Sequence, residues 1–132
     1  MAEVPTLRVV AAVIERDGRY LITQRRPTAV LPLLWEFPGG KVEPGETDAE
    51  ALKREVRHRL GVGVTPLAPI SSVTHPYERY TVELHLYECR LDEGEPMERN
   101  VNAFKWVSSA EFEQHPFTPA DELSMSRLLG VG

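Results

Sequence analysis

The stretch from Gly40 to Val62 constrains this chain most, because a glycine-rich turn leads directly into a well-marked helix. Thr47 is suited to the N-cap of that helix, and Glu50 three residues later completes a capping box. Gly61 supplies the C-terminal stop. Apolar residues at helical spacing predict one face that packs on a sheet. These residues are Ala49, Leu52, Val56 and Leu60.

One edge of the same helix carries charge. Glu55 and Arg59 stand at positions i and i+4, so their side chains lie on one side of the helix, with His58 beside them. We expect this edge of the helix to face the ligand that the Gly39-Gly40 turn binds.

The rest of the chain mixes strands and helices. An aliphatic run predicts a buried strand over 7–15, and Asp17-Gly18 predicts a hairpin turn into a strand over 20–24. Prolines at positions 27 and 32 indicate a loop over 25–34. Further strands are expected over 64–73, 80–89 and 103–107, and helices over 108–114 and 121–129, the latter starting near Thr118 or Asp121. This pattern predicts an α/β chain in three layers, forming a single domain over residues 1–132.

Composition limits the kinds of partner. A formal net charge of −5 over 132 residues argues against binding to a nucleic-acid polymer, although a small anion needs only a local basic cluster. The single cysteine, Cys89, excludes an internal disulfide and fits a reducing compartment. The sequence has neither an apolar run of membrane-spanning length nor a signal-peptide pattern, so we expect a cytoplasmic protein without a membrane partner.

Seven residues of the turn and helix fit a known motif. Gly40, Glu46, Arg54, Glu55, Val56, Gly61 and Val62 match the Nudix box, G-x5-E-x7-R-E-U-x-E-E-x-G-U, in which U is a bulky aliphatic residue. His58 and Arg59 stand where the family has Glu-Glu, so the box is degenerate by this comparison. The segment Leu34-Trp35-Glu36-Phe37-Pro38-Gly39-Gly40 resembles MutT-type nucleoside triphosphate pyrophosphohydrolases. The resemblance implies a Nudix-type α/β/α sandwich with a mixed central sheet, and hydrolysis of a nucleoside triphosphate to the monophosphate and pyrophosphate.

The resemblance also implies a metal centre, with Mg²⁺ or Mn²⁺ as the expected cofactor. Glu55 would be a metal ligand or base, Arg54 and Glu46 would support it as part of the catalytic group, and a carbonyl of Gly39 or Gly40 would complete the shell. A further acidic position of the family aligns with Asn100, with Glu95 and Glu98 nearby. We therefore expect metal binding and metal-dependent catalysis to be weakened.

His58 and Arg59 each allow two interpretations. Arg59 either forms a solvated i,i+4 ion pair with Glu55 or replaces the metal and binds phosphate oxygens in a bidentate manner. His58 is either a surface residue or, with Glu55, part of a transition-metal site at i and i+3 spacing.

Similarity to the MutT type also implies which residues would bind the nucleotide. By this similarity Phe37, Asp121 and Arg79 would bind the base, and Arg25 would approach the nucleotide. Together with Arg25, we expect the cations Lys41 and Arg59 to bind the phosphates. Core packing is the alternative for Phe37, and an exposed strand position the alternative for Arg79. Aspartate only accepts hydrogen bonds when it is ionised, so Asp121 favours a base that presents amino or imino hydrogens.

Three functions remain open at this point. The chain is either a working nucleoside triphosphate hydrolase, a non-catalytic nucleotide-binding module, or an interaction module on the same fold. A nucleoside triphosphate or related nucleotide is the expected partner of the first two, and a homodimer is a state that many relatives adopt.

Overall fold

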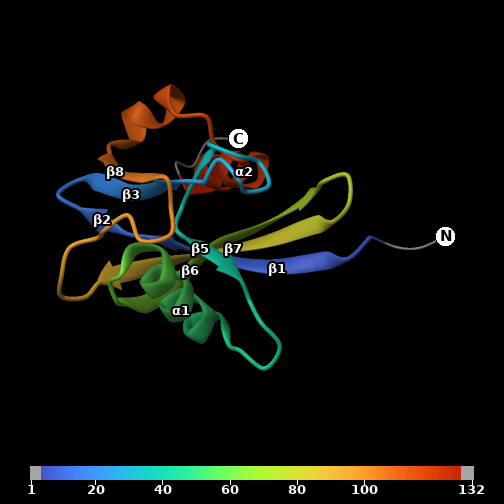
Figure 1. Ribbon diagram of the computed structural model, residues 1–132, viewed down its shortest axis with the longest axis horizontal. Coiled ribbons are helices and arrows are strands. Elements are labelled where there is room, and N and C mark those ends of the chain that lie inside the picture. Colours follow the sequence, from blue (N-terminus) through green and yellow to red (C-terminus); the bar gives the residue numbers. More distant parts are fainter. Residues whose placement is uncertain (1–3, 129–132) are drawn as a thin grey trace.

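The computed structural model describes residues 4–128, which form two sheets and three helical segments (Figure 1). The elements, in chain order, are β1 (Thr6–Val13), β2 (Glu15–Arg16), β3 (Arg19–Gln24), β4 (Trp35–Glu36), β5 (Gly39–Lys41), α1 (Asp48–Leu60), β6 (Val64–Pro76), β7 (Thr81–Leu91), β8 (Ala103–Val107), the 3₁₀ helix η1 (Ser109–Gln114) and α2 (Pro119–Leu128).

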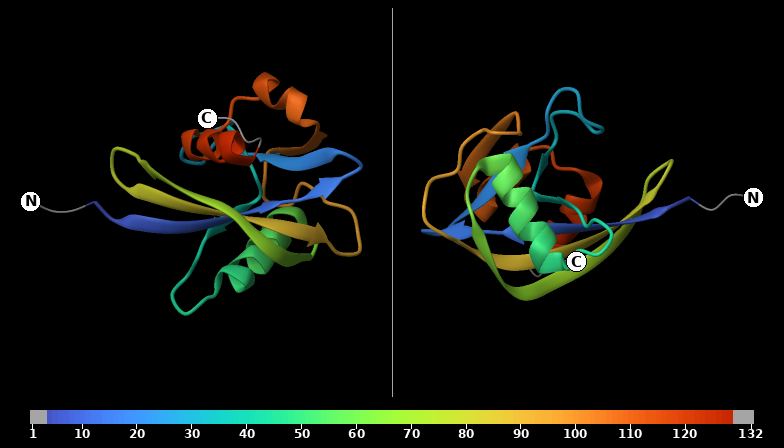
Figure 2. Two further views of the ribbon diagram at one scale, coloured as in Figure 1. Left: turned by 180° about the vertical axis from the view of Figure 1, so that it is seen from behind. Right: turned by 60° about the horizontal axis from the view of Figure 1, so that its bottom comes forward.

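The larger sheet has the strand order β5-β1-β7-β6 and is mixed, because β1 runs parallel to β7 while the other neighbours are antiparallel. The smaller sheet is antiparallel and contains β2, β3, β4 and β8. Helix α1 covers one face of the mixed sheet, and the second sheet, η1 and α2 lie on the other side (Figures 1 and 2). The expected α/β class with a mixed sheet and flanking helices is confirmed, and the split into two sheets is a feature that the sequence did not predict.

Local signals account for the first hairpin and for α1. Asp17 and Gly18 both have positive φ, 53° and 76°, as a tight hairpin turn requires. In α1 the Thr47 side chain accepts from the Glu50 amide, the Glu50 side chain accepts from the Thr47 amide, and Gly61 ends the helix in the left-handed conformation. The expected caps are confirmed.

The apolar face of α1 differs from the expected one at one position. Leu52, Val56 and Leu60 are fully buried against the mixed sheet, but Ala49 is exposed and Ala51 is buried in its place. The assignment of Ala49 was wrong because Ala49 and Ala51 lie on opposite sides of the helical stripe, and the nearby sequence does not say which side meets the sheet.

Other boundaries moved by a few residues. Strand β6 continues to Pro76 and β7 to Leu91, and residues 25–34 form the expected loop without strand or helix. The expected helix over 108–114 is 3₁₀, and α2 begins at Pro119, two residues before the expected start, while Leu129 lies outside the described residues. Within residues 4–128, no helix is long and apolar enough to cross a bilayer.

The hydrophobic core has two parts, one on each face of the mixed sheet. One part joins α1 to β1, β6 and β7. The other joins the two sheets to η1 and α2, and it contains Phe37, Phe112 and Phe117 with ring centroids 5.7–6.1 Å apart. Strands β4 and β5 thus run along the boundary between the two parts.

Candidate functional site

Strand β5, which contains Gly39 and Gly40, brings the backbone unusually close to its neighbours. A Cβ on Gly39 would lie 1.9 Å from the Val10 carbonyl oxygen, and a Cβ on Gly40 would lie 2.4 Å from the Glu55 carboxyl carbon. A side chain at position 39 would overlap the backbone of β1, and a side chain at position 40 would displace the Glu55 side chain. The Glu55 carboxylate can therefore sit directly against the backbone of β5.

Arg54 fixes this carboxylate in place. Its Nη1 donates to Glu55 Oε1 at 2.6 Å, its Nε donates to Glu46 Oε2 at 2.6 Å, and its Nη2 donates to the Lys41 carbonyl at 2.9 Å. Glu46 also accepts from the Glu43 amide at 2.9 Å. Hydrogen bonds from Arg54 are the main reason that the pKa of Glu46 falls to about 2. Glu46 and Arg54 therefore hold the turn, the helix and Glu55 in one geometry.

Arg59 occupies the other side of Glu55. Its Nε donates to Glu55 Oε2 at 3.0 Å, and its Nη1 lies 3.9 Å from Glu36 Oε2. Arg25 Nη1 donates to Glu36 Oε1 at 3.1 Å. Both oxygens of Glu55 are thus engaged by guanidinium groups. The side chains of Arg59 and Glu55 are only 24% and 12% exposed, so the pair lines a cavity and is not part of a freely solvated helix surface.

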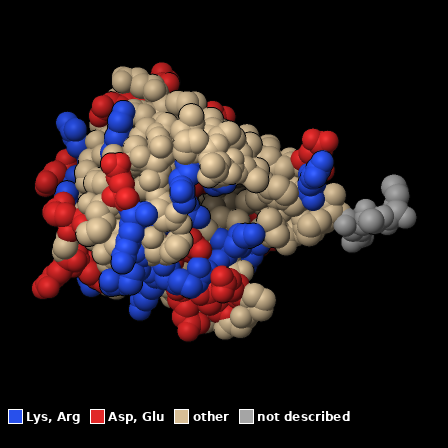
Figure 3. Space-filling view, in the orientation of Figure 1, with Lys and Arg blue, Asp and Glu red and all other residues tan. Residues whose placement is uncertain are grey.

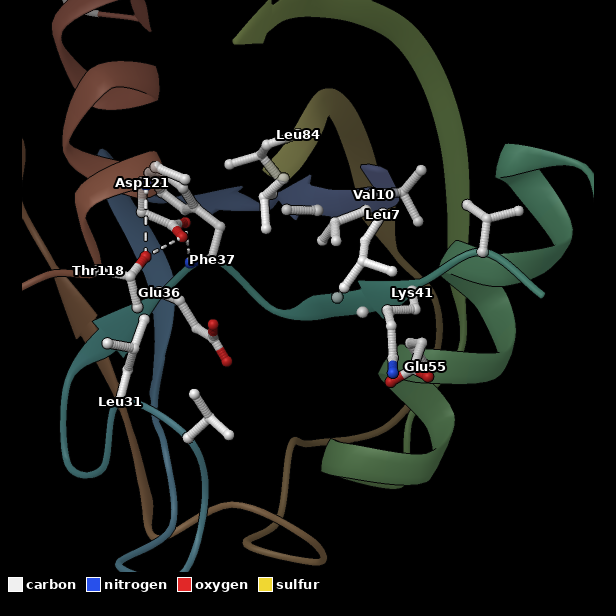
Figure 4. A pocket seen from close by; sticks show the side chains of 18 of the residues that line it. Leu7, Val10, Leu31, Glu36, Phe37, Lys41, Glu55, Leu84, Thr118 and Asp121 are labelled. Carbon is white, nitrogen blue, oxygen red and sulfur yellow. Dashed lines mark hydrogen bonds between the residues drawn. The ribbon is translucent and has the colours of Figure 1, made fainter. Parts of the chain in front are cut away.

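That cavity has a volume of about 700 Å³ and lies between the mixed sheet, the 25–34 loop and α2 (Figure 4). Glu36, Thr118 and Asp121 surround one end, Lys41 and Glu55 lie at the other, and aliphatic side chains of the mixed sheet form the wall between them. An elongated ligand with one polar flat group and one highly charged group would match these two ends.

Asp121 is buried at the first end. Its Oδ1 accepts from the Phe37 amide at 3.0 Å and its Oδ2 accepts from the Thr118 hydroxyl at 2.5 Å. Burial, and then the negative charge of Glu36, raise the pKa of Asp121 to about 7, although these two hydrogen bonds oppose the shift. Burial also raises the pKa of Glu36, against the opposing charges of Arg25 and Arg59.

The structure brings together most of the residues singled out from the sequence. Those that line the cavity are Arg25, Phe37, Gly40, Lys41, Glu55, Arg59 and Asp121. Glu46 supports Arg54 from outside it. Arg79 does not join them, because it is exposed at the tip of the β6–β7 hairpin and is not among the lining residues.

His58 lies in a different place from Glu55. Its Nε2 is 2.5 Å from the Asn100 side-chain nitrogen, and both residues line a separate cleft beside α1. The structure therefore does not join the His58 imidazole and the Glu55 carboxylate at one ligand position.

Sequence reasoning missed several lining residues. Glu36 belongs to the quoted Trp-Glu-Phe segment but received no role, and its position next to Phe37 was the available signal. Tyr77 and Tyr80 form a wall from the long hairpin, and the Tyr77 hydroxyl accepts from the Ala120 amide at 3.3 Å. Their contribution depends on how far the hairpin bends over the cavity, which no local pattern reveals.

Comparison with known proteins agrees with this geometry. The NUDIX domain family model matches residues 9–127. The CTP pyrophosphohydrolase of Escherichia coli (strain K12) is 38% identical over 115 residues, which cover 87% of this chain and 85% of that protein. The putative 8-oxo-dGTP diphosphatase 2 of Mycobacterium tuberculosis (strain CDC 1551 / Oshkosh) is 40% identical over 114 residues, covering 86% of this chain and 81% of that protein.

A solved structure shows the same likeness in three dimensions. The solution structure of the E. coli ORF135 protein superimposes with a TM-score of 0.82 at 34% identity and covers 96% of this chain and 91% of that one. The mixed sheet, the glycine turn and the helix edge with Arg54 and Glu55 are thus those of a MutT-like fold. The chain belongs to the Nudix family.

Nudix proteins typically use a divalent metal, so the fit of the present residues to such an ion matters. Mg²⁺ prefers several hard oxygen ligands, and carboxylates supply most of them. Among residues 4–128 there is no group of three or more His, Cys, Asp or Glu residues arranged to hold a metal. Glu50 caps the helix, and Glu55 is held by two arginines. In this arrangement the side chains do not fit a carboxylate-rich metal centre.

Proposed function

We propose that this protein binds nucleoside triphosphates in the 700 Å³ cavity and hydrolyses them to the monophosphate and pyrophosphate, with metal-dependent catalysis weakened by His58 and Arg59. The observation that carries the proposal is the two-ended cavity, with Phe37 and Asp121 at one end and Lys41 and Arg59 beside Glu55 at the other. The names of the relatives in E. coli and M. tuberculosis support a nucleotide substrate.

The charged end suits a polyphosphate. Lys41 and Arg59 carry fixed positive charge, and a guanidinium binds phosphate oxygens in bidentate geometry. A phosphate group that replaces Glu55 as the partner of Arg59 would also free one Glu55 oxygen. Substrate binding and the release of this carboxylate would then be coupled.

The hydrogen-bonding properties of the Asp121 carboxylate fit a role in binding the base of the nucleotide. In its ionised form the carboxylate only accepts hydrogen bonds, so it favours a base edge with N–H groups, as in cytosine or guanine, over uracil. We expect nucleotide affinities measured at pH 8 to follow this order. Tightest binding by uridine triphosphate would contradict the role of Asp121.

One observation favours a second candidate function, a nucleotide-binding module without hydrolysis. Both oxygens of Glu55 accept from Arg54 and Arg59, and these two guanidinium groups compete with a metal ion or a substrate proton for the same carboxylate. The two candidates predict the same binding and differ only in turnover.

The experiment that separates them measures pyrophosphate release and nucleotide binding in parallel, over a nucleotide panel with Mg²⁺ or Mn²⁺. If the proposed hydrolase is correct, Glu55→Gln abolishes the residual turnover, and the double variant His58→Glu, Arg59→Glu raises it at least tenfold. Lys53→Gln, at an exposed position on the same helix, is the control and should change neither quantity. Turnover that survives Glu55→Gln unchanged would show that the reaction occurs elsewhere, and binding without any turnover would identify the non-catalytic module.

A further inference from the structure

Three sulfur atoms lie within residues 4–128, and they differ in how well an oxidant can reach them. Cys89 is 4% exposed, and burial raises the pKa of its thiol to about 12, so the reactive thiolate does not form near neutral pH. Met125 is partly buried against the core between the two sheets. Met97, in the β7–β8 loop of residues 92–102, is 53% exposed. Met97 is therefore the most accessible of the three.

The Met97 side chain packs directly on the glycine that ends α1. A Cβ on Gly61 would lie 3.0 Å from Met97 Cγ and 3.1 Å from its Sδ, so the thioether covers the open face of this residue. Gly61 has a φ of 70° and donates its amide hydrogen to the Arg57 carbonyl. The contact thus joins an exposed, oxidisable side chain to the C-terminal end of the helix that carries Glu55.

The backbone around Met97 completes the hydrogen bonding of the same helix end. The Met97 amide donates to the Leu60 carbonyl at 2.9 Å, and the amides of Arg99 and Asn100 donate to the Arg59 carbonyl at 3.2 and 3.0 Å. The last carbonyls of a helix have no partner within the helix, so they depend on a segment of this kind or on water. The thioether contact and the three amides together hold the β7–β8 loop on α1.

Oxidation would change this contact because a sulfoxide is polar. The thioether of methionine packs well against backbone carbon, whereas the sulfoxide carries an oxygen that needs hydrogen-bond donors. The amides of Gly61, Met97 and Arg99 already donate to carbonyls, so this oxygen would find its donors in water. The oxidised side chain would therefore leave Gly61, and the loop would lose its apolar contact with the helix.

The electrostatic surroundings of Met97 favour an uncharged oxidant. Acidic side chains gather at the left edge of the face shown in Figure 3, where Figure 1 places the β7–β8 loop. Glu95 and Glu98 stand on either side of Met97 in this loop, and both are exposed. An anionic oxidant would be repelled there, whereas hydrogen peroxide carries no charge.

We propose that Met97 is an oxidative modification site, at which hydrogen peroxide forms methionine sulfoxide and weakens the attachment of the β7–β8 loop to α1. The Met97 sulfur donates an electron pair to one peroxide oxygen, and the O–O bond breaks as the S–O bond forms. The released hydroxide takes the proton from the transferred oxygen and leaves as water, so the sulfur is oxidised and the peroxide is reduced. The last turn of α1 also carries Arg59, which donates to Glu55, so the modification would act on the cavity from outside it.

The experiment treats the folded protein with hydrogen peroxide. Peptide mass mapping identifies the residue that gains an oxygen atom, NMR measures hydrogen exchange of the Met97, Arg99 and Asn100 amides, and calorimetry measures the melting temperature. Met97→Leu keeps the apolar volume without the sulfur, and Met97→Gln places a polar group of similar length on Gly61. The matched control is Met125→Leu, which removes the less exposed methionine sulfur.

We expect Met97 to gain its oxygen roughly tenfold faster than Met125. In the oxidised parent the three amides should exchange roughly tenfold faster, and the melting temperature should fall by roughly 3–6 °C. Met97→Gln should show both changes without peroxide, and Met97→Leu should show neither with it. Methionine sulfoxide reductases should reverse both changes in the oxidised parent, and Met125→Leu should respond to peroxide as the parent does.

Oxidation of Met125 as fast as that of Met97 would overturn the proposal, and so would an oxidised Met97 whose loop amides exchange at the unoxidised rate. An equal fall in melting temperature for Met97→Leu and the parent in peroxide would place the sensitive group elsewhere, with the same consequence. None of these measurements needs a nucleotide, so failure of the proposed hydrolysis would leave their outcome unchanged.

Discussion

Asp121 shows how much a single buried carboxylate can influence both stability and binding. It is 6% exposed, yet it accepts hydrogen bonds from the Phe37 amide and the Thr118 hydroxyl and so links the segment that follows β4 to the start of α2. Its pKa of about 7 lies above the ordinary value of 3.8, so the folded state binds more protons than the unfolded state between about pH 4 and pH 7. Stability from this group is therefore greatest below pH 4 and falls as the pH rises through about 7.

The corresponding prediction concerns Asp121→Asn. Asparagine can accept from the Phe37 amide and donate to the Thr118 oxygen, but it carries no charge to bury. We expect the variant to raise the melting temperature at pH 8 by roughly 3–6 °C, which is about 1 kcal/mol for a chain of this size, and to change it little at pH 4. Differential scanning calorimetry at the two pH values tests this, with the exposed Glu113→Gln as control. An equal change at both pH values would show that ionisation of Asp121 is not the cause.

At the scale of elements, the close contact of β5 with β1 and α1 determines the site. Gly39 faces the Val10 carbonyl of β1, which is backbone and cannot move aside, whereas Gly40 faces the Glu55 side chain of α1, which can. The two glycines are adjacent, but Gly39 allows β5 to pair closely with β1, and Gly40 leaves room for the Glu55 carboxylate.

We therefore expect the two alanine variants to differ. Gly39→Ala should lower the free energy of unfolding by at least about 3 kcal/mol, because an overlap with backbone forces β1 and β5 apart. Gly40→Ala should unfold at nearly the parent urea concentration but displace Glu55 and lower nucleotide turnover at least tenfold. Gly63→Ala is the matched control, since its new Cβ would come within 3.4 Å only of the ends of the Arg57 and Asp92 side chains, at 2.9 and 3.1 Å. If Gly39→Ala and Gly40→Ala lost equal stability, the distinction between backbone and side-chain contact would be wrong.

The elements that could be predicted from the sequence are those specified by nearby residues. The Thr47–Glu50 capping box, the Gly61 stop and the Asp17-Gly18 turn each lie within a few residues of the structure they determine. The two-sheet arrangement could not be predicted, because it depends on pairing between distant segments, such as β3 with β8. The same limit applies within the site. Arg54 and Glu46 were identified from one motif, whereas the contact of His58 with Asn100 spans 42 positions.

At the scale of the whole molecule, the two ends of α1 are anchored by different parts of the chain. At the C-terminal end, the Leu60 and Arg59 carbonyls accept from amides of the β7–β8 loop. At the N-terminal end, Asp48 accepts two hydrogen bonds from Arg8 of β1, at 2.8 and 2.7 Å, and one from the Tyr87 hydroxyl of β7. Asp48 is thus the point at which the helical layer is attached to the two central strands of the mixed sheet.

This attachment should fail in acid. Hydrogen bonds from Arg8 are the largest cause that lowers the pKa of Asp48 from 3.8 to about 2. Because the folded pKa lies below the unfolded one, the stabilisation is complete above about pH 4 and is lost as the pH falls toward 2.

We expect Asp48→Asn to lower the free energy of unfolding by roughly 1 kcal/mol at pH 7, after allowance for solvent screening, and by much less at pH 2. Urea unfolding at both pH values measures this, with Asp17→Asn as a control that keeps a residue tolerant of positive φ in the hairpin turn. If the loss at pH 7 were no greater for Asp48→Asn than for Asp17→Asn, the helix would be held by its apolar face alone, and the acid sensitivity of the fold would have to come from other carboxylates.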